Sequence, residues 1–340
     1  MGDGAGIGPE IIAKAFRDAP LELAGCVVVG DVATLRRAAA LVAAPLALPV
    51  LQLESLEEAQ SLPPNCIPVL QKCALPAPVP YGLVNPLAGQ AAADCIVWAA
   101  HAALAGQSAA VITAPIHKEA LSAAGGWAAR FPGHTEMLQA EAAAFLGQPV
   151  HDVPVRMMLA NDELKTVLVS IHLSLRQAIE AVTFENVLQT LRITHKAVSA
   201  SLGRSPRIGV AGLNPHAGEG GLFGNEEQQI IAPAIAAARA EGIDARGPYA
   251  PDTVFMRARH TAGKTGEFDV VVAMHHDQGL IPVKYLGVEQ GVNVTLGLPL
   301  VRTSPDHGTA FDIAGTGRAD ASSLLAAIRM ARRLLKTEKR

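Results

Sequence analysis

Cysteine is scarce in this chain: its 340 residues include four, and no two of them stand in a C-x-x-C pair. All of them lie in the first third of the chain, at Cys26, Cys66, Cys73 and Cys95. We interpret them as small core residues of a protein in a reducing compartment.

An excess of positive charge is missing too. The formal net charge is -3, charged residues make up 17% of the chain, and no Lys- or Arg-rich run precedes residues 336–340. This composition argues against a nucleic-acid binder. Any anionic ligand must therefore be held by a few local cations rather than by a general basic field.

Long apolar runs and targeting signals are absent as well. No stretch of 18 or more apolar residues occurs, because Pro45 and Pro49 interrupt the best candidate at residues 41–51. No signal peptide or N-myristoylation pattern is visible. With 50% hydrophobic residues, we expect a globular, cytoplasmic protein that does not enter a membrane.

Neither common nucleotide fingerprint is found. G-x-G-x-x-G fits no register of the glycine-rich residues 1–10, and G-x-x-x-x-G-K-[ST] does not occur. Residues 1–10 still predict a turn into a helix, since Pro9 suits a first helical turn and Glu10 complements the helix dipole. This helix start could face an anion, but a plain connection explains it equally well. A strand is expected before such a turn, and Met1 alone stands before Gly2 in this sequence, so the position of the native N-terminus stays open.

What the sequence does contain is a repeated alternation of apolar runs and helical patterns. The apolar runs lie at residues 26–30, 109–113, 155–159, 166–171, 208–211 and 270–273, and the helical patterns at residues 33–42, 90–105, from 137 and 175–182. Residues 63–86 are rich in proline and predict an irregular excursion. This alternation predicts an α/β fold, and the length favours about two domains.

Most of the chemistry lies in residues 268–317. Four groups able to bind metal or move protons follow the apolar run 270–273, at His275, His276, Asp277 and Gln278. Open α/β sheets bind ligands beyond the carboxyl ends of their strands, so a site is expected here. Further polar groups follow among glycines and prolines, at Lys284, Asn293, Arg302, Asp306 and His307. We interpret the stretch as a catalytic loop.

Three histidines, His172, His216 and His276, each follow a predicted strand. Imidazoles converging from three strand ends suit zinc, cobalt or nickel, and three protein ligands leave positions open for a substrate. Any one of them alone is more often a surface or core residue. Because adjacent strand residues face opposite ways, we expect only one of His275 and His276 to point into the site.

His134 and Thr135 form a second candidate site. They lie at the predicted start of a helix, where backbone N–H groups suit an anionic substrate group. The alternative is that Thr135 only caps the helix.

Eight ordered segments spread over the chain resemble the 4-hydroxythreonine-4-phosphate dehydrogenase family of vitamin B6 biosynthesis. They are GDGAGIGPE, TAPIHKEAL, PGHTE, SIHLSLRQAI, GLNPHAGEGG, HHDQGLIPVKY, GVNVTLGLP and RTSPDHGTAFDIAGTGRAD. The resemblance implies a two-domain α/β fold like isocitrate and isopropylmalate dehydrogenases. It also implies a homodimer and an active-site cleft between domains at the dimer interface.

The resemblance also implies roles for individual residues. A divalent metal (zinc, cobalt or magnesium) is expected on His172, His216 and His276. Substrate contacts are expected on His134, Thr135, Lys284, Asn293 and Arg302, and contacts to NAD or NADP on His307, Gly308, Thr309 and Asp312. The expected domains are a cofactor-side domain of residues 1–128 and 303–340 and a metal- and substrate-binding, dimer-forming domain of residues 129–302.

The implied reaction oxidises 4-phosphohydroxy-L-threonine to 2-amino-3-oxo-4-phosphooxybutanoate, which decarboxylates to 3-amino-2-oxopropyl phosphate. We expect Lys284 to be the general base, Asp277 to orient His276 or relay a proton, and Arg302 to hold an anionic oxygen pair. Asp252, or Asp277, is placed to serve the substrate amine.

Departures from the family and rival functions stay open. Gly4 stands where the family usually has proline, and His275 stands where a tyrosine is common. A sister group oxidises phosphorylated four-carbon sugar acids such as 4-phosphothreonate or 4-phosphoerythronate and shares these motifs. A metal-dependent hydrolase would leave residues 305–317 without a purpose. An acyltransferase of the phosphate acetyltransferase kind would leave the three histidines unexplained.

Overall fold

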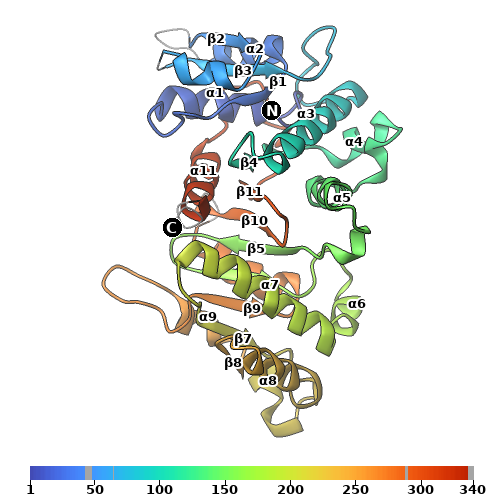
Figure 1. Cartoon of the computed structure of the whole chain (residues 1–340), viewed down its shortest axis with the longest axis vertical. Helices are drawn as coiled ribbons and strands as arrows, with labels where there is room; N and C mark the ends of the chain where they lie inside the picture. Colours follow the sequence, from blue (N-terminus) through green and yellow to red (C-terminus); the bar gives the residue numbers. More distant parts are fainter. Residues whose placement is uncertain (43–47, 64, 288–289, 336–340) are drawn as a thin grey trace. The chain divides into compact units, whose positions relative to one another are not determined.

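The computed structural model describes residues 1–42, 48–63, 65–287 and 290–335, so Pro45 and the basic residues at 336–340 lie outside the described chain (Figure 1). The chain divides into two compact units. Unit 1 consists of Met1–Pro154 and Leu298–Ala331, and unit 2 of Val155–Gly297 and the described residues from Arg332 onward. Both units mix helices with mainly parallel strands, which confirms the predicted α/β class.

Unit 1 contains a parallel three-stranded sheet and a separate parallel strand pair. The sheet has the order β1 (Val28–Gly30), β3 (Ile67–Gln71), β2 (Val50–Leu53), and the pair is β4 (Ala110–Ile112) with β11 (Val301–Pro305). The helices are α1 (Gly8–Asp18), α2 (Val32–Val42), α3 (Pro86–Leu104), α4 (Lys118–Ala124) and α5 (His134–Leu146), with α11 (Ser322–Leu335) beginning in this unit. Short 3₁₀ turns are η1 (Glu57–Ser61), η2 (Ala128–Arg130) and η3 (Val150–Asp152).

Unit 2 is built on strands in the order β10 (Val292–Leu296), β5 (Arg156–Ala160), β6 (Lys165–Leu168), β9 (Val270–Ala273), β7 (Ile208–Ala211) and β8 (Ala245–Tyr249). From β6 to β8 the strands are parallel, with Thr166 opposite Val271 and Ile208 opposite Val270. Every residue of β9 is buried. This is the fully buried strand that its apolar run predicts.

The helical segments of unit 2 are α6 (Leu175–Glu180), α7 (Phe184–Leu202), η4 (Pro215–Gly221), the π-helical η5 (Glu227–Ile231), α8 (Ala232–Ala240), α9 (Val254–Ala258) and α10 (His276–Tyr285). In Figure 1, α7 and α8 lie in front of the strands. α10 packs directly against β5, β6 and β9. The side chain of Thr166 fixes it by donating to the carbonyl of Gly279 at 3.0 Å, and Asn161 Nδ2 donates to the carbonyl of Val283 at 3.2 Å.

Two predictions about local structure are wrong. Residues 63–86, expected to be irregular, contain the buried strand β3, whose hydrogen-bonding partners β1 and β2 are far from it in sequence. The catalytic loop expected after β9 begins as helix α10. His275 is the N-cap of this helix and His276 its first residue. Strand alternation therefore does not decide which of the two points into the site.

The units differ from the expected domains in their bounds. Residues 129–154 were expected with the second domain, but they belong to unit 1. The reason is that Met137 and Leu138 of α5 are fully buried in a cluster with Ile96 of α3 and Leu121 of α4. At the other end, the division before Leu298 assigns Arg302 to unit 1 as well.

Helix α3 is the one helix among the described residues that is long and apolar enough to cross a membrane by length and composition. Half of the tested window is buried within the structure. Its buried residues include Ala91, Cys95 and Ile96, which belong to two core clusters of unit 1. A core helix passes the same composition test, and the packing accounts for the apolar character of α3.

Asp269 ties the entrance of β9 to the segment before β7. It is buried, and its carboxylate accepts hydrogen bonds from Arg204 at 2.8 and 2.9 Å and from the backbone N–H of Arg207 at 2.8 Å. Burial acts to raise the pKa of Asp269, but the hydrogen bonds from Arg204 and Arg207 outweigh it and hold this pKa well below its ordinary value.

We expect Asp269→Asn to lower the free energy of unfolding by about 2–3 kcal/mol near neutral pH, as for lost hydrogen bonds to a charged group. Because the pKa is depressed in the folded state, the stabilisation exists above about pH 4 and is lost as the pH falls below it. Urea unfolding between pH 3 and 8 measures both. Glu267→Gln removes the exposed bond to Arg257 and is the control, with an expected effect under about 1 kcal/mol. An equal effect of both substitutions at every pH would contradict the assignment.

Candidate active site

Four of the predicted site residues of unit 2 follow four neighbouring parallel strands. His172 follows β6, His276 follows β9, His216 follows β7 and Asp252 follows β8. The carboxyl ends of parallel neighbours share one edge of a sheet, where α/β folds bind ligands. The chain therefore brings these four residues to the same edge, which the sequence predicts for the three histidines but not for Asp252.

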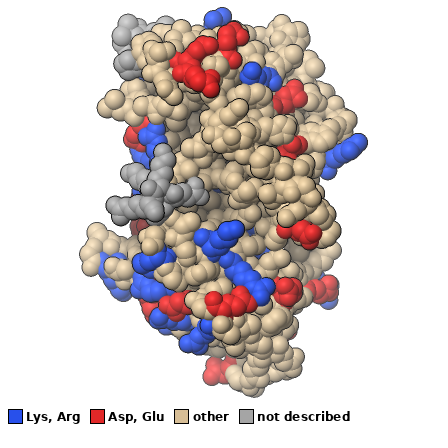
Figure 2. Space-filling model, viewed as in Figure 1, with Lys and Arg blue, Asp and Glu red and all other residues tan. Residues whose placement is uncertain are grey.

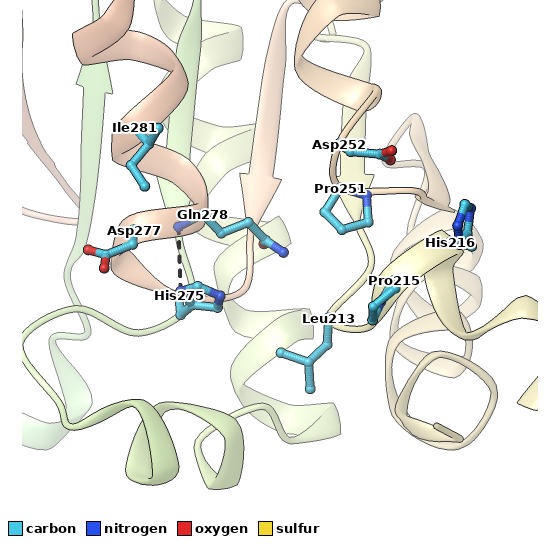
Figure 3. Close-up of a pocket in the computed structure, with 9 residues that line it drawn as sticks. All are labelled: Leu213, Pro215, His216, Pro251, Asp252, His275, Asp277, Gln278 and Ile281. Atoms are coloured by element: carbon cyan, nitrogen blue, oxygen red, sulfur yellow. Dashed lines mark hydrogen bonds between the residues drawn. The ribbon is translucent and has the colours of Figure 1, made fainter. Parts of the chain in front are cut away.

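A pocket of about 460 Å³ opens at this edge (Figure 3). It is lined by Leu213, Pro215, His216, Pro251, Asp252, His275, Asp277, Gln278 and Ile281. Figure 3 shows the residues of α10 and its N-cap on one side and the loops carrying Asp252 and His216 on the other. Gln278 joins the two sides, since its Nε2 donates to the carbonyl of Gly212 at 2.8 Å.

His276 lies beside His172, with 5.9 Å between their ring centroids. Its Nδ1 shares a hydrogen bond of 2.7 Å with Asp277, and this bond lowers the pKa of Asp277. A carboxylate on one ring nitrogen leaves Nε2 of His276 as the atom able to bind a ligand. The orienting role expected for Asp277 thus has a physical basis.

The donor atoms suit a metal that prefers imidazole, but they are only partly assembled. A metal–nitrogen bond of about 2.0–2.1 Å is compatible with two rings as close as those of His172 and His276. His216 lines the pocket from the next loop. Within the described ranges, however, no group of three or more His, Cys, Asp or Glu side chains is placed to hold an ion. The three-histidine ligand set remains a prediction.

His275 and Gln278 line the pocket although the sequence gives them no specific role. The Nδ1 of His275 accepts a hydrogen bond from the Gln278 backbone at 3.4 Å, which caps α10. Burial lowers the pKa of His275, against the opposing effect of Asp277. Lys284 and Asn293 are half-buried, in the last turn of α10 and in β10, and are not among the lining residues.

In unit 1, the buried Arg302 and the partly buried His134 are close enough to affect each other electrostatically. Arg302 lies in β11 with 3% of its surface exposed, and its Nη2 donates to Thr113 Oγ1 at 2.8 Å. Burial lowers the pKa of Arg302 to about 10, while the negative charge of Glu136 acts to raise it. Burial and then Arg302 lower the pKa of His134 to about 3. His134 is therefore neutral at physiological pH, and its Nε2 donates to the carbonyl of Ala114 at 3.1 Å.

Thr135 is the second residue of α5, and it is half-buried. The N-cap is Gly133, without a side-chain capping bond. The alternative that Thr135 merely caps this helix is therefore wrong, and its hydroxyl stays a candidate for contact with an anion.

The loop expected to bind the cofactor is seated on the N-terminal turn of unit 1. The backbone N–H of Ile7 donates to the carbonyl of Thr309 at 3.0 Å, and a Cβ at Gly6 would lie 2.8 Å from the Thr309 side chain. The predicted turn into α1 therefore packs against the loop that contains Thr309, and its residues are buried instead of open to solvent. His307 has a buried Nε2 with no hydrogen-bond partner among the described residues. Gly308 and Asp312 are exposed.

Positive charge does not form one continuous area on the face shown in Figure 2, although Asp and Glu side chains form a group near its upper end. Elsewhere on this face, Lys and Arg lie among Asp and Glu. This agrees with the expectation from composition that an anionic ligand would be held by a few local cations, for which Arg302 is a candidate.

Comparison with known proteins gives consistent matches over nearly the whole chain. The family model described as "Pyridoxal phosphate biosynthetic protein PdxA" matches residues 22–331. A 4-hydroxythreonine-4-phosphate dehydrogenase of Beijerinckia indica is 52% identical, over 98% of this chain and 93% of the relative. A D-threonate 4-phosphate dehydrogenase of Salmonella typhimurium is 43% identical, over 98% and 97%. The solved structure of a 4-hydroxythreonine-4-phosphate dehydrogenase from Klebsiella pneumoniae has a TM-score of 0.84 and 42% identity, covering 98% of both chains.

Proposed function

Because the chain belongs to the PdxA family of pyridoxal phosphate biosynthetic proteins, we propose that it is a nicotinamide-dependent dehydrogenase that oxidises 4-phosphohydroxy-L-threonine. The product, 2-amino-3-oxo-4-phosphooxybutanoate, is a β-keto acid that decarboxylates to 3-amino-2-oxopropyl phosphate. The observation that carries the proposal is the convergence of His172, His216, His276 and Asp252 on one edge of four parallel strands. The Beijerinckia indica relative, 52% identical to this chain, carries the same activity in its name.

The residues of unit 2 divide the chemistry of an alcohol oxidation among them. We assign Lys284 as the base that accepts the proton of the alcohol. Asp277 holds the ring of His276 through its 2.7 Å hydrogen bond, and Asn293 contacts the substrate as a neutral donor or acceptor. A divalent metal (zinc, cobalt or magnesium) on His172, His216 and His276 would supply Lewis acidity that favours loss of this proton.

The residues of unit 1 suit anion and cofactor binding. The planar guanidinium of Arg302 matches a carboxylate or phosphate oxygen pair. His134, neutral by its lowered pKa, and the Thr135 hydroxyl add hydrogen bonds at the start of α5. We assign His307, Gly308, Thr309 and Asp312 to NAD or NADP, which accepts the hydride. The whole enzyme is proposed to be a cytoplasmic homodimer.

The alternative substrate is a phosphorylated sugar acid. The relatives named D-threonate 4-phosphate dehydrogenase are 42–43% identical to this chain. The 4-hydroxythreonine-4-phosphate dehydrogenase of Beijerinckia indica is 52% identical to it. 4-Phosphothreonate and 4-phosphoerythronate share the phosphate, the carboxylate and the alcohol, but carry a hydroxyl at the second carbon in place of the amine. This single group decides between the two functions.

A nicotinamide-reduction assay tests the proposal. The enzyme, loaded in turn with zinc, cobalt or magnesium, is mixed with NAD or NADP and 4-phosphohydroxythreonine, with and without a chelator. We expect reduction that the chelator abolishes. The absence of reduction with every metal would refute the dehydrogenase, and a higher kcat/KM for 4-phosphoerythronate would transfer the assignment to the sister activity.

Asp252 is the residue on which the choice of substrate is expected to depend. It is exposed and lines the pocket of Figure 3, where a carboxylate would pair with a substrate ammonium. We expect Asp252→Asn to lower kcat/KM for 4-phosphohydroxythreonine by about 2–5 kcal/mol of transition-state stabilisation, and that for 4-phosphoerythronate much less. Steady-state kinetics with both substrates measure the difference. Equal losses would mean that Asp252 does not read the amine.

His307 provides the corresponding test for the cofactor. Its buried Nε2 has no partner among the described residues, so it is available to hydrogen-bond a nucleotide. We expect His307→Ala to raise the KM for NAD by about tenfold, as for one lost hydrogen bond of about 1–1.5 kcal/mol, with little change in the KM for substrate. An effect on substrate alone would move the loop to the substrate side.

A further inference from the structure

The turn that carries His216 has an unusual backbone. Six consecutive residues have positive φ. The first five lie in the left-handed region, with values of 53° at His216, 53° at Ala217, 80° at Gly218, 43° at Glu219 and 67° at Gly220, and Gly221 follows at 104°. For a residue with a Cβ this left-handed conformation costs about 1–2 kcal/mol. Only Gly218 and Gly220 adopt it without that penalty. Tertiary contacts must therefore hold the turn.

One buried side chain, Glu227, supplies hydrogen bonds where the turn begins. It is 3% exposed. Its Oε1 accepts the backbone N–H groups of Leu213 and Asn214, both at 2.7 Å, and its Oε2 accepts Asn214 Nδ2 at 3.0 Å. These hydrogen bonds fix the chain just before Pro215 and His216, at the point where the left-handed turn begins.

The loop closes around this carboxyl group. A Cβ on Gly218 would lie 2.7 Å from Glu227 Oε2, and one on Gly212 would lie 3.0 Å from Oε1. Glycine is therefore required at both positions for the backbone to approach the carboxyl oxygens. Glu227 is also the first residue of the π-helical segment η5, a local distortion that is common beside functional sites.

We propose that Glu227 is a positioning residue that holds the left-handed turn His216–Gly220 and thereby presents His216 to the pocket. Figure 3 shows His216 at the end of the loop that begins with Leu213 and Pro215. The inference rests on the proposed function, because it assigns Glu227 to the support of a metal-binding histidine. Glu227 itself is not among the residues that line the pocket.

Cobalt binding to the purified protein tests this without relying on turnover. Visible absorption follows a Co²⁺ titration of wild type, Glu227→Gln and the neighbouring control Glu226→Gln, with His216→Ala marking the loss of a ligand. Glu226 bonds to the Asn214 side chain at 2.7 Å but not to the loop backbone. We expect Glu227→Gln to weaken Co²⁺ binding by about 10–100-fold, as for other residues that orient a metal ligand. The Co²⁺ affinity of Glu226→Gln should stay within about threefold of the wild-type affinity, well short of the loss expected for Glu227→Gln.

A second substitution separates positioning from any other role of Glu227. Ala217→Gly removes the Cβ that disfavours φ 53°, so it lowers the cost of the turn that Glu227 is inferred to hold. We expect Ala217→Gly to leave wild-type binding unchanged and to recover several-fold of the affinity lost in Glu227→Gln. If Glu227→Gln fails to fold, as judged by thermal unfolding, Asn214→Ala replaces it. That variant removes the 3.0 Å bond to Glu227 and leaves the two backbone bonds to Glu227 in place. It also removes the 2.7 Å bond to Glu226, whose contribution Glu226→Gln measures separately, and we expect a smaller loss in the same direction.

The outcomes distinguish the inference from the function on which it rests. A wild-type protein that neither binds Co²⁺ nor reduces the nicotinamide would overturn the proposed function. A wild type that does both, with wild-type Co²⁺ affinity in Glu227→Gln or in its substitute Asn214→Ala, would overturn the positioning role alone. Loss of affinity without any rescue by Ala217→Gly would also overturn it.

Discussion

Replacing His216 with alanine is expected to remove the bound metal and to lower kcat/KM by more than about 100-fold, since even residues that only orient a metal ligand contribute 10–100-fold. The fold should survive, because His216 is exposed on a loop and belongs to none of the described core clusters. Elemental analysis of the purified variant measures the metal, circular dichroism the fold, and the nicotinamide assay the activity.

Two sets of variants sharpen this expectation. His151→Ala, at an exposed histidine of η3 paired with Asp152, should keep both metal and activity. In the doublet, His276→Ala should abolish metal binding and His275→Ala should weaken it little. The reason is that His276 lies beside His172, while His275 is occupied in capping α10. Wild-type metal content in His216→Ala, or the reverse ranking of the doublet, would refute the ligand set.

Replacing Arg302 with methionine is expected to separate activity from stability. Loss of the guanidinium should lower kcat/KM by at least about 30-fold, or about 2 kcal/mol, as for a lost buried charge contact. The melting temperature should stay the same or rise. Arg302 is almost fully buried in β11, and an apolar side chain of similar length removes the desolvation penalty of several kcal/mol that a buried charge carries.

The matched control is Arg156→Met, in β5. Arg156 is also partly buried and donates to Thr190 Oγ1 at 2.7 Å and Gln189 Oε1 at 2.8 Å, which gives it a structural role. We expect this variant to be less stable and to keep its kcat/KM. The kcat/KM of Arg302→Lys should lie between the values of wild type and Arg302→Met. Lysine retains the positive charge but lacks the planar guanidinium that donates two parallel hydrogen bonds. A large fall in melting temperature together with unchanged kinetics for Arg302→Met would show that Arg302 is structural.

The sequence predicts the α/β class and the common edge of the three histidines because both depend on local patterns. A short run such as residues 270–273 is apolar throughout, which indicates a strand covered on both faces. The structure has it as β9, with β6 and β7 as parallel neighbours. Once these strands are parallel, the residues that follow them reach one edge without further information.

Other features depend on contacts that no local pattern reveals. Strand β3 pairs with β1 and β2 across long sequence separations and contains Pro68, a residue that disfavours strands. Helix α10 contains Gly279 and Pro282, which normally interrupt helices. The support of His216 by Glu227 depends on the folded loop, since glutamate before a helix is unremarkable in sequence.

The position of β8 at the end of its sheet has a consequence for substrate range. Asp252 and Pro251 follow this strand, which has β7 as its neighbour in the described strand order. The opposite wall of the pocket belongs to α10, which is anchored separately on β5, β6 and β9. The loop after β8, which carries Pro251 and Asp252, can therefore change in sequence and length while His172 and His276 keep their positions. Enzymes that act on amino and hydroxy acids could diverge by exchanging this one loop, and the same loop is the natural place to redesign specificity.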